Sequence, residues 1–112
     1  MALAAGRLRH RVEIEEQIAE RDSDGVLVTY WAPVASVWAA VEPVSVKEWI
    51  QSGQMQSEVK ARFVIRYRPD IRASMRIVHR GLYYNIAGAF SDKESGLEYL
   101  TLPVTEGVND GQ

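Results

Sequence analysis

Residues 60–80 decide the fold, and they read KARFVIRYRPDIRASMRIVHR. Apolar side chains alternate with basic or polar ones on both sides of the Pro69-Asp70 interruption. Because neighbouring side chains of a β-strand point to opposite faces, the pattern predicts two strands, each with an apolar face and a basic face. In a small sheet the two strands are expected to place their guanidinium groups on one surface. Guanidinium groups suit paired contacts with carboxylates and phosphates, so a functional basic surface and a plain solvated sheet face both stay open. The basic residues are Lys60, Arg62, Arg66, Arg68, Arg72, Arg76 and Arg80.

The length of 112 residues allows one domain with a modest core. A composition of 46% hydrophobic and 25% charged residues is typical of a globular protein. The net charge of −2 argues against a chain that binds nucleic acid through overall positive charge. We expect a single domain over residues 1–112, with a flexible arm at 1–6, a β-barrel at 7–105 and a flexible tail at 106–112.

Acidic residues gather on either side of the basic stretch, in residues 13–24 and again from Asp92 to Asp110. A molecule with an acidic pole and a basic pole is suited to head-to-tail association with copies of itself or with neighbours.

Period-two alternation and turn signals predict short strands along the whole chain. Asp24-Gly25 is a hairpin signal inside a turn or loop at 19–25. Pro33 lies within the second strand, which indicates an edge position, a bulge or two shorter strands there. Trp38 is expected in the core. The expected strands cover 7–15, 26–42, 58–68, 74–80, 82–90 and 97–105.

A short helix is predicted at residues 45–52. Ser45 and Glu48 have the spacing of a capping box, and Gly53 is a natural terminator. The fold is therefore expected to be mainly β: a small antiparallel barrel or sandwich of about six strands, with one short helix between strands two and three.

Catalytic and cofactor chemistry finds no support in the sequence. The chain has no cysteine, and no serine lies in a nucleophile-elbow pattern. His10 and His79 lie in the same alternating strand positions as apolar residues, which predicts histidines packed in the core or at its rim. No metal-ligand spacing, cofactor motif or membrane-spanning apolar run is present, so we expect a cytoplasmic product that is not an enzyme.

Several strings in the sequence together resemble the phage head–tail joining family, also called head-completion, head–tail adaptor or stopper proteins. Their order and spacing carry the resemblance, which extends over residues 5–102. The strings are Ala5–Val12, Val37–Pro43, Lys47-Glu48, Ile65–Pro69, Met75–Val78 and Tyr84–Ile86.

The resemblance implies a small β-barrel that acts as a structural protein without catalysis or cofactor. It implies a ring, twelve copies on the particle, below the portal and adaptor proteins. Such a ring closes the DNA exit channel and docks the tail, with the tail terminator protein as a further partner. The expected locations are the host cytoplasm during assembly and the head–tail interface of the virion. In some members the segment between strands two and three closes the channel; by position this implies a channel loop at residues 43–57, containing Trp49, Gln51, Gln54 and Gln56.

DNA must slide through such a channel, and many phosphate-binding arginines would hold it back. We therefore predict that most of the arginines form ion pairs between subunits or with partners, while neutral glutamines line the channel and DNA passes without specific binding. The candidate contact residues are Arg62, Arg66, Arg68, Arg76, Arg80, Glu13 and Glu15.

Two other functions stay open. A small barrel can bind nucleic acid through basic grooves and stacked aromatic rings, although alternation places Phe63 and Tyr67 on the face opposite the arginines. A general protein-interaction module is the second. Salt-dependent affinity for single-stranded DNA would favour the first of these.

Overall fold

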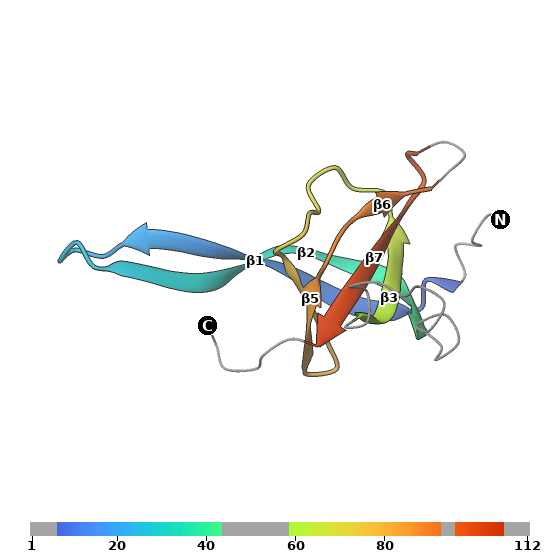
Figure 1. The fold of residues 1–112 in the computed structure, drawn as a ribbon, viewed down its shortest axis with the longest axis horizontal. Helices are drawn as coiled ribbons and strands as arrows, with labels where there is room; N and C mark the ends of the chain where they lie inside the picture. Colours follow the sequence, from blue (N-terminus) through green and yellow to red (C-terminus); the bar gives the residue numbers. More distant parts are fainter. Residues whose placement is uncertain (1–6, 44–58, 93–95, 107–112) are drawn as a thin grey trace.

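The computed structural model describes residues 7–43, 59–92 and 96–106, and within these ranges the chain forms one antiparallel sheet of seven strands (Figure 1). The mainly β expectation is confirmed. No helix long and apolar enough to span a membrane occurs in these ranges. The strands are β1 (His10–Arg21), β2 (Leu27–Pro43), β3 (Val59–Arg66), β4 (Arg76–His79), β5 (Leu82–Ile86), β6 (Phe90–Ser91) and β7 (Tyr99–Glu106).

The sheet closes on itself as a barrel. The strand order is β3-β2-β1-β4-β5-β7-β6, and β3 also pairs with β7. The two-residue strand β6 pairs with β7 at Leu100 and Thr101. Strand β5 pairs with the other end of β7, at residues 104–106. Around the closed ring, β3 and β4 are therefore three strands apart in either direction, on opposite sides of the barrel.

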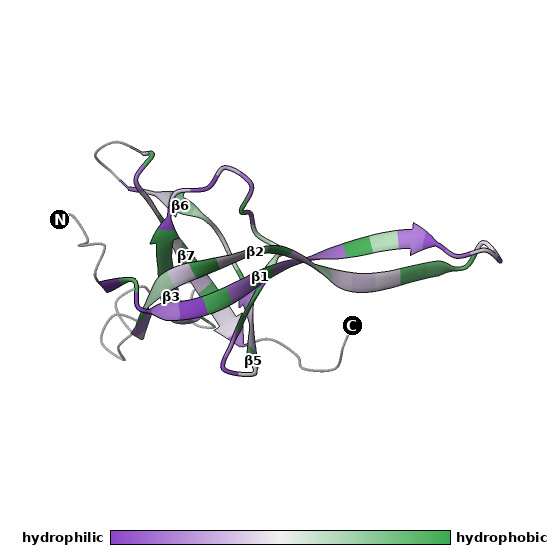
Figure 2. Cartoon of the chain, turned by 180° about the vertical axis from the view of Figure 1, so that it is seen from behind, coloured by the Kyte–Doolittle hydropathy of each residue, from purple (hydrophilic) through white to green (hydrophobic). Residues whose placement is uncertain are grey.

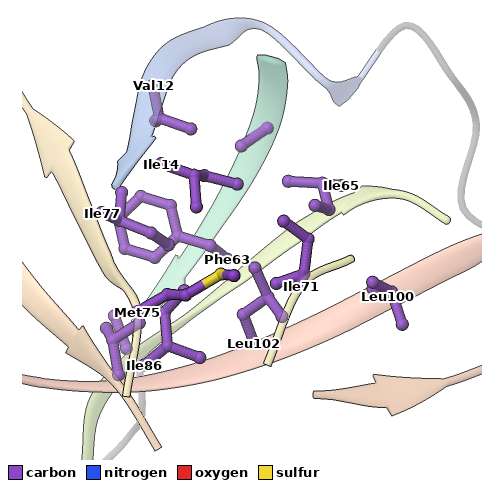
Figure 3. Close-up of a cluster of buried hydrophobic side chains, with 13 residues drawn as sticks. Val12, Ile14, Phe63, Ile65, Ile71, Met75, Ile77, Ile86, Leu100 and Leu102 are labelled. Atoms are coloured by element: carbon purple, nitrogen blue, oxygen red, sulfur yellow. The ribbon is translucent and has the colours of Figure 1, made fainter. Parts of the chain in front are cut away.

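The barrel interior is filled by apolar side chains from every long strand (Figure 3). The alternation of residues 61–65 is confirmed, because Ala61, Phe63 and Ile65 point inward and are buried. The largest fully buried side chains are Phe63, Ile14, Ile65, Ile77, Leu102, Val12 and Val104.

A second, smaller cluster lies on the outer face of the sheet. Leu8 folds back over β2, β3 and β7 and packs with Ala40, Val64 and Tyr99. This contact covers Val64, which the alternation had placed on the polar face.

Strands β1 and β2 continue beyond the barrel as a two-stranded hairpin arm, residues 15–33 (Figure 1). The arm gives the molecule an elongated shape of 53 × 29 × 24 Å. The register shifts between Ile14 and Glu15, where Val34 is the extra residue of a bulge beside Pro33. Of the three alternatives for Pro33, the structure shows both a bulge and an edge position, because β3 pairs with β2 only from Ala39 onward. The bulge re-aims the ribbon as it leaves the barrel.

The arm ends in a tight turn at residues 22–26, shorter than the loop expected at 19–25. Asp22 Oδ1 accepts hydrogen bonds from the backbone N–H groups of Asp24 and Val26, both at 2.9 Å. Gly25 has φ +79°, a conformation that glycine adopts without steric cost. These contacts let β1 run on to Arg21.

Three further features differ from expectation. The fifth strand divides into β5 and β6, with Gly88 between them. Trp38 is 52% exposed rather than buried, because Val37 and Ala39 on either side of it take the inward positions. The helix expected at 45–52 lies outside the described residues.

Candidate functional site

The hairpin arm presents apolar side chains that the chain itself does not cover. Every residue from Ala19 to Tyr30 is exposed, and Figure 2 shows hydrophobic segments along the ribbon. The register places Glu20 opposite Val28 and Ile18 opposite Tyr30, so these four share one face of the ribbon. Exposed apolar groups on a projecting element are typical of an interaction site.

The base of the arm is held by a stacked arginine. Arg76 on β4 is only 6% exposed, and its guanidinium lies 4.2 Å from the ring centre of Trp31 and 4.3 Å from that of Tyr83. Its Nε donates a 2.8 Å hydrogen bond to Glu15 Oε1. Nη1 is buried without a hydrogen-bond partner among the described residues. The arginine thus joins β1, β2, β4 and β5 where the arm leaves the barrel.

A second, more exposed ion pair supports the same place. Arg72, in the segment before β4, lies 3.2 Å from Glu16 on the arm, and its side chain is 65% exposed. Glu15 and Glu16, two acids of the acidic stretch at residues 13–24, are therefore each paired with an arginine of the same chain.

A groove of about 320 Å³ lies where β2 passes the end of β3 on its way to the arm. Among the lining residues that the structure describes, three are arginines and none is an acid. Trp38 forms an exposed aromatic wall, with the Arg11 guanidinium 5.1 Å from its ring centre. The lining residues are Leu8, Arg11, Ser36, Val37, Trp38, Arg66, Tyr67 and Arg68.

Hydrogen bonds fix two of these arginines. Arg11 Nε donates to Ser36 Oγ at 2.9 Å, and Ser36 Oγ donates to Glu13 Oε2 at 2.8 Å. Arg68 donates to both carboxylate oxygens of Asp70, at 3.1 and 2.9 Å. These hydrogen bonds lower the pKa of Asp70 and raise the pKa of Arg68. Arg66 is exposed, with its guanidinium 6.0 Å from the Tyr99 ring.

The predicted contact residues do not form one surface. Arg62 and Arg66 lie on β3, while Arg76 is on β4 and Arg80 follows it, on the opposite side of the barrel. Arg62 lies 3.8 Å from Glu42, and Arg80 occupies the β4–β5 turn with φ +55°. The single basic face expected from the sequence is therefore wrong, because β1 and β2 separate the two strands.

For Arg76 and Glu15 the structure shows a role inside the chain. For the other contact residues, an inter-subunit role stays a prediction. The predicted channel-loop residues Trp49, Gln51, Gln54 and Gln56 lie outside the described residues.

The two histidines lie together at the barrel wall. Their ring centres are 5.3 Å apart, and His79 also contacts Phe63 edge-on at 5.8 Å. Burial lowers the pKa of His79, with smaller contributions from the charges of His10 and Arg80. In the described ranges, no three His, Cys, Asp or Glu side chains gather as metal ligands would.

Sequence reasoning missed Trp31 and Tyr83 as partners of Arg76. They are 52 residues apart in the chain, and both reach Arg76 only once β1, with β2 beside it, and β5 have paired with β4. The signal that could have found them is weak: an arginine at an outward strand position with aromatic residues on other predicted strands.

Comparison with known proteins completes this description. The sequence pattern of the family described as phage head completion protein matches residues 3–107. The chain belongs to this family. Membership gives it a structural role in the phage virion, in the head–tail region, as the resemblance found in the sequence had implied.

Individual relatives agree with this assignment. Head completion protein gp7 of Enterobacteria phage HK97 is 31% identical over 88 residues, which cover 74% of this chain and 79% of gp7. The solution structure of protein SF1141 from Shigella flexneri 2a is similar with a TM-score of 0.78 and 33% identity, over 96% of this chain and 100% of that one. A chain in the virion of a native gene transfer agent particle shares the fold, with a TM-score of 0.58 and 20% identity over 89% of this chain and 94% of that chain.

Proposed function

We propose that this head completion protein joins the DNA-filled head to the tail as a ring of identical subunits, twelve on the particle. The ring lies below the portal and adaptor proteins, closes the DNA exit channel and provides the surface on which the tail terminator protein docks. The family match over residues 3–107 carries the proposal. The protein acts without catalysis or cofactor, and it is in the host cytoplasm until it joins the particle.

The shape of the subunit supports an assembly role. A compact barrel that folds within one chain carries an arm whose apolar residues stay exposed. Exposed apolar surface on a projecting arm favours association with another protein chain. Surfaces of this kind are what a ring subunit needs toward its neighbours.

The described structure gives less support to a nucleic-acid-binding barrel. Phe63 is buried inside the barrel, where no base can stack on it, and β3 and β4 divide the arginines between opposite sides. A single-strand-binding surface would need aromatic rings and cations along one continuous path.

Channel closure by the segment between β2 and β3 remains part of the proposal. Trp49, Gln51, Gln54 and Gln56 are the residues proposed to face the channel. Neutral amides would let the DNA slide, because they release no counterions on contact with phosphate.

The test is deletion of the gene in its phage or prophage, followed by electron microscopy of the released particles. The proposal predicts tailless heads that lose their DNA, beside separate complete tails. Supplying the wild-type gene from a plasmid should restore tailed particles. Normal tailed particles after deletion would remove the proposed role, and the affinity of the protein for single-stranded DNA at several salt concentrations would then decide on the nucleic-acid-binding alternative.

A further inference from the structure

The arm and the groove are complementary, and we propose that they bind each other between neighbouring copies of the chain. The arm of one subunit, residues 15–33, lies in the groove at the base of the next subunit's arm. This inference rests on the ring proposed above and names the two surfaces that build it.

The arm supplies apolar groups and negative charge. Val28 and Tyr30 are exposed on one face of the ribbon, and Glu20 stands opposite Val28 on that same face. Partial desolvation, followed by the charge of the Glu20 carboxylate and its hydrogen bond with the Tyr30 hydroxyl, raises the pKa of that hydroxyl, which is neutral at physiological pH. The outer part of the arm, residues 17–30, contains three acids, Glu20, Asp22 and Asp24, against one base, Arg21.

The groove supplies the matching groups. Trp38 offers half of its surface as an apolar wall, and Arg66 is exposed. The largely buried Leu8 also lines the groove. Arg11 and Arg68 add positive charge to the groove. Arg11 is linked to Glu13 through Ser36, and Arg68 is hydrogen-bonded directly to Asp70. Opposite charges around an apolar centre favour one orientation of docking over others.

An arm cannot fill its own groove. Val28 and Ser36 lie on the same continuous strand, and eight residues of strand span about 26 Å. The arm also leads away from the barrel on which the groove lies (Figure 1). An arm that lies in the groove must therefore come from another copy, and because two different surfaces meet, the contact is heterologous and can repeat around a closed ring.

The absence of native cysteine allows a direct test by cross-linking. A phage would carry Val28→Cys and Ser36→Cys in the same chain, with each single substitution as its control. No disulfide can form within the chain, because bonded cysteines have Cα atoms less than about 7 Å apart. Purified particles would be treated with a mild oxidant and run on a non-reducing gel with immunoblotting.

The proposal predicts a ladder of dimers, trimers and larger species from the double variant, and monomers from both single variants. A dimer from Val28→Cys alone would mean that arms meet arms and would overturn it. Monomers from infectious double-variant particles would overturn it as well, while leaving the head–tail role intact. Normal particles after gene deletion would instead remove the head–tail role itself, so the two failures are distinguishable.

If the double-cysteine variant is not incorporated into particles, an exchange of charge between Glu20 and Arg66 tests the contact between arm and groove instead. Glu20→Lys and Arg66→Glu should each lower the infectious titre by about tenfold or more, since each places like charges together. The combined variant should recover most of that loss. Circular dichroism of the purified proteins shows whether each variant is folded, and folded single variants without recovery in the combination would refute the contact.

Discussion

Arg76 shows how one side chain can fix the position of an entire arm. Its guanidinium stacks between Trp31 and Tyr83 and bonds to Glu15, so four strands depend on one residue. Charge reversal of Arg76 would therefore break the fold before it could report on assembly. Arg66, which is exposed, is the residue at which assembly can be tested.

Replacing Arg76 by alanine should lower the free energy of unfolding by about 2–3 kcal/mol, because it removes two cation–π contacts and leaves Glu15 partly buried without its partner. Arg72→Ala is the matched control, since it also removes an arginine bound to a glutamate of the arm, but at an exposed position. Its effect should stay below about 1 kcal/mol. Urea denaturation of both variants measures the difference, and equal losses would contradict the role assigned to Arg76.

His79 should make the barrel sensitive to mild acid. Its pKa is lowered in the folded protein, so below the ordinary value of 6.5 the unfolded chain binds a proton more readily than the folded one. Stability should accordingly be full above pH 6.5 and fall as the pH drops below it. Thermal unfolding midpoints over this range would measure the effect. The effect should shrink in His79→Phe, and an unchanged pH profile in that variant would assign it to other groups.

At the scale of the element, the arm should behave as a less stable unit than the barrel. Every residue from Ala19 to Tyr30 is exposed, so the backbone hydrogen bonds in this part of the arm have little apolar cover. Asp22→Ala removes both hydrogen bonds that the Asp22 side chain accepts in the turn. The cost is about 1 kcal/mol, which corresponds to roughly fivefold faster amide exchange in the arm. Exchange at Phe63 and Leu102 should not change. Ser23→Ala is the control, and acceleration spread through the barrel would contradict an independent arm.

Elements were predictable where the pattern is local. Alternation around Phe63 identified β3 and its inward face, and Asp24-Gly25 located the hairpin turn. The extension of β1 to Arg21 was not predictable, because residues 15–21 lack the apolar alternation of a strand that packs on a core. Cross-strand hydrogen bonds with β2 and the capped turn hold that segment extended instead.

At the scale of the whole molecule, the site could be predicted only in part. The sequence indicated an acidic region and a basic region and their use in association. It could not indicate that β3 and β4 lie on opposite sides of the barrel, since this depends on the order in which the strands pair. It also could not show that Trp38 faces outward, because Val37 and Val34 beside it are equally apolar.

Arg66→Glu should leave the barrel folded and reduce the incorporation of the protein into particles. Lys60→Glu makes the same change of charge on β3, at an exposed residue outside the groove, and should have little effect. Quantitative immunoblotting of purified particles measures incorporation. Equal reductions in the two variants would show that net charge, rather than the groove, controls assembly.

The most direct measurement is an electron cryomicroscopy reconstruction of the head–tail junction of the assembled particle. The account predicts a ring of these barrels between the portal–adaptor assembly and the tail, with each arm lying in the groove beside Trp38 of its neighbour. Complete tailed particles whose junction lacks this barrel would contradict the account.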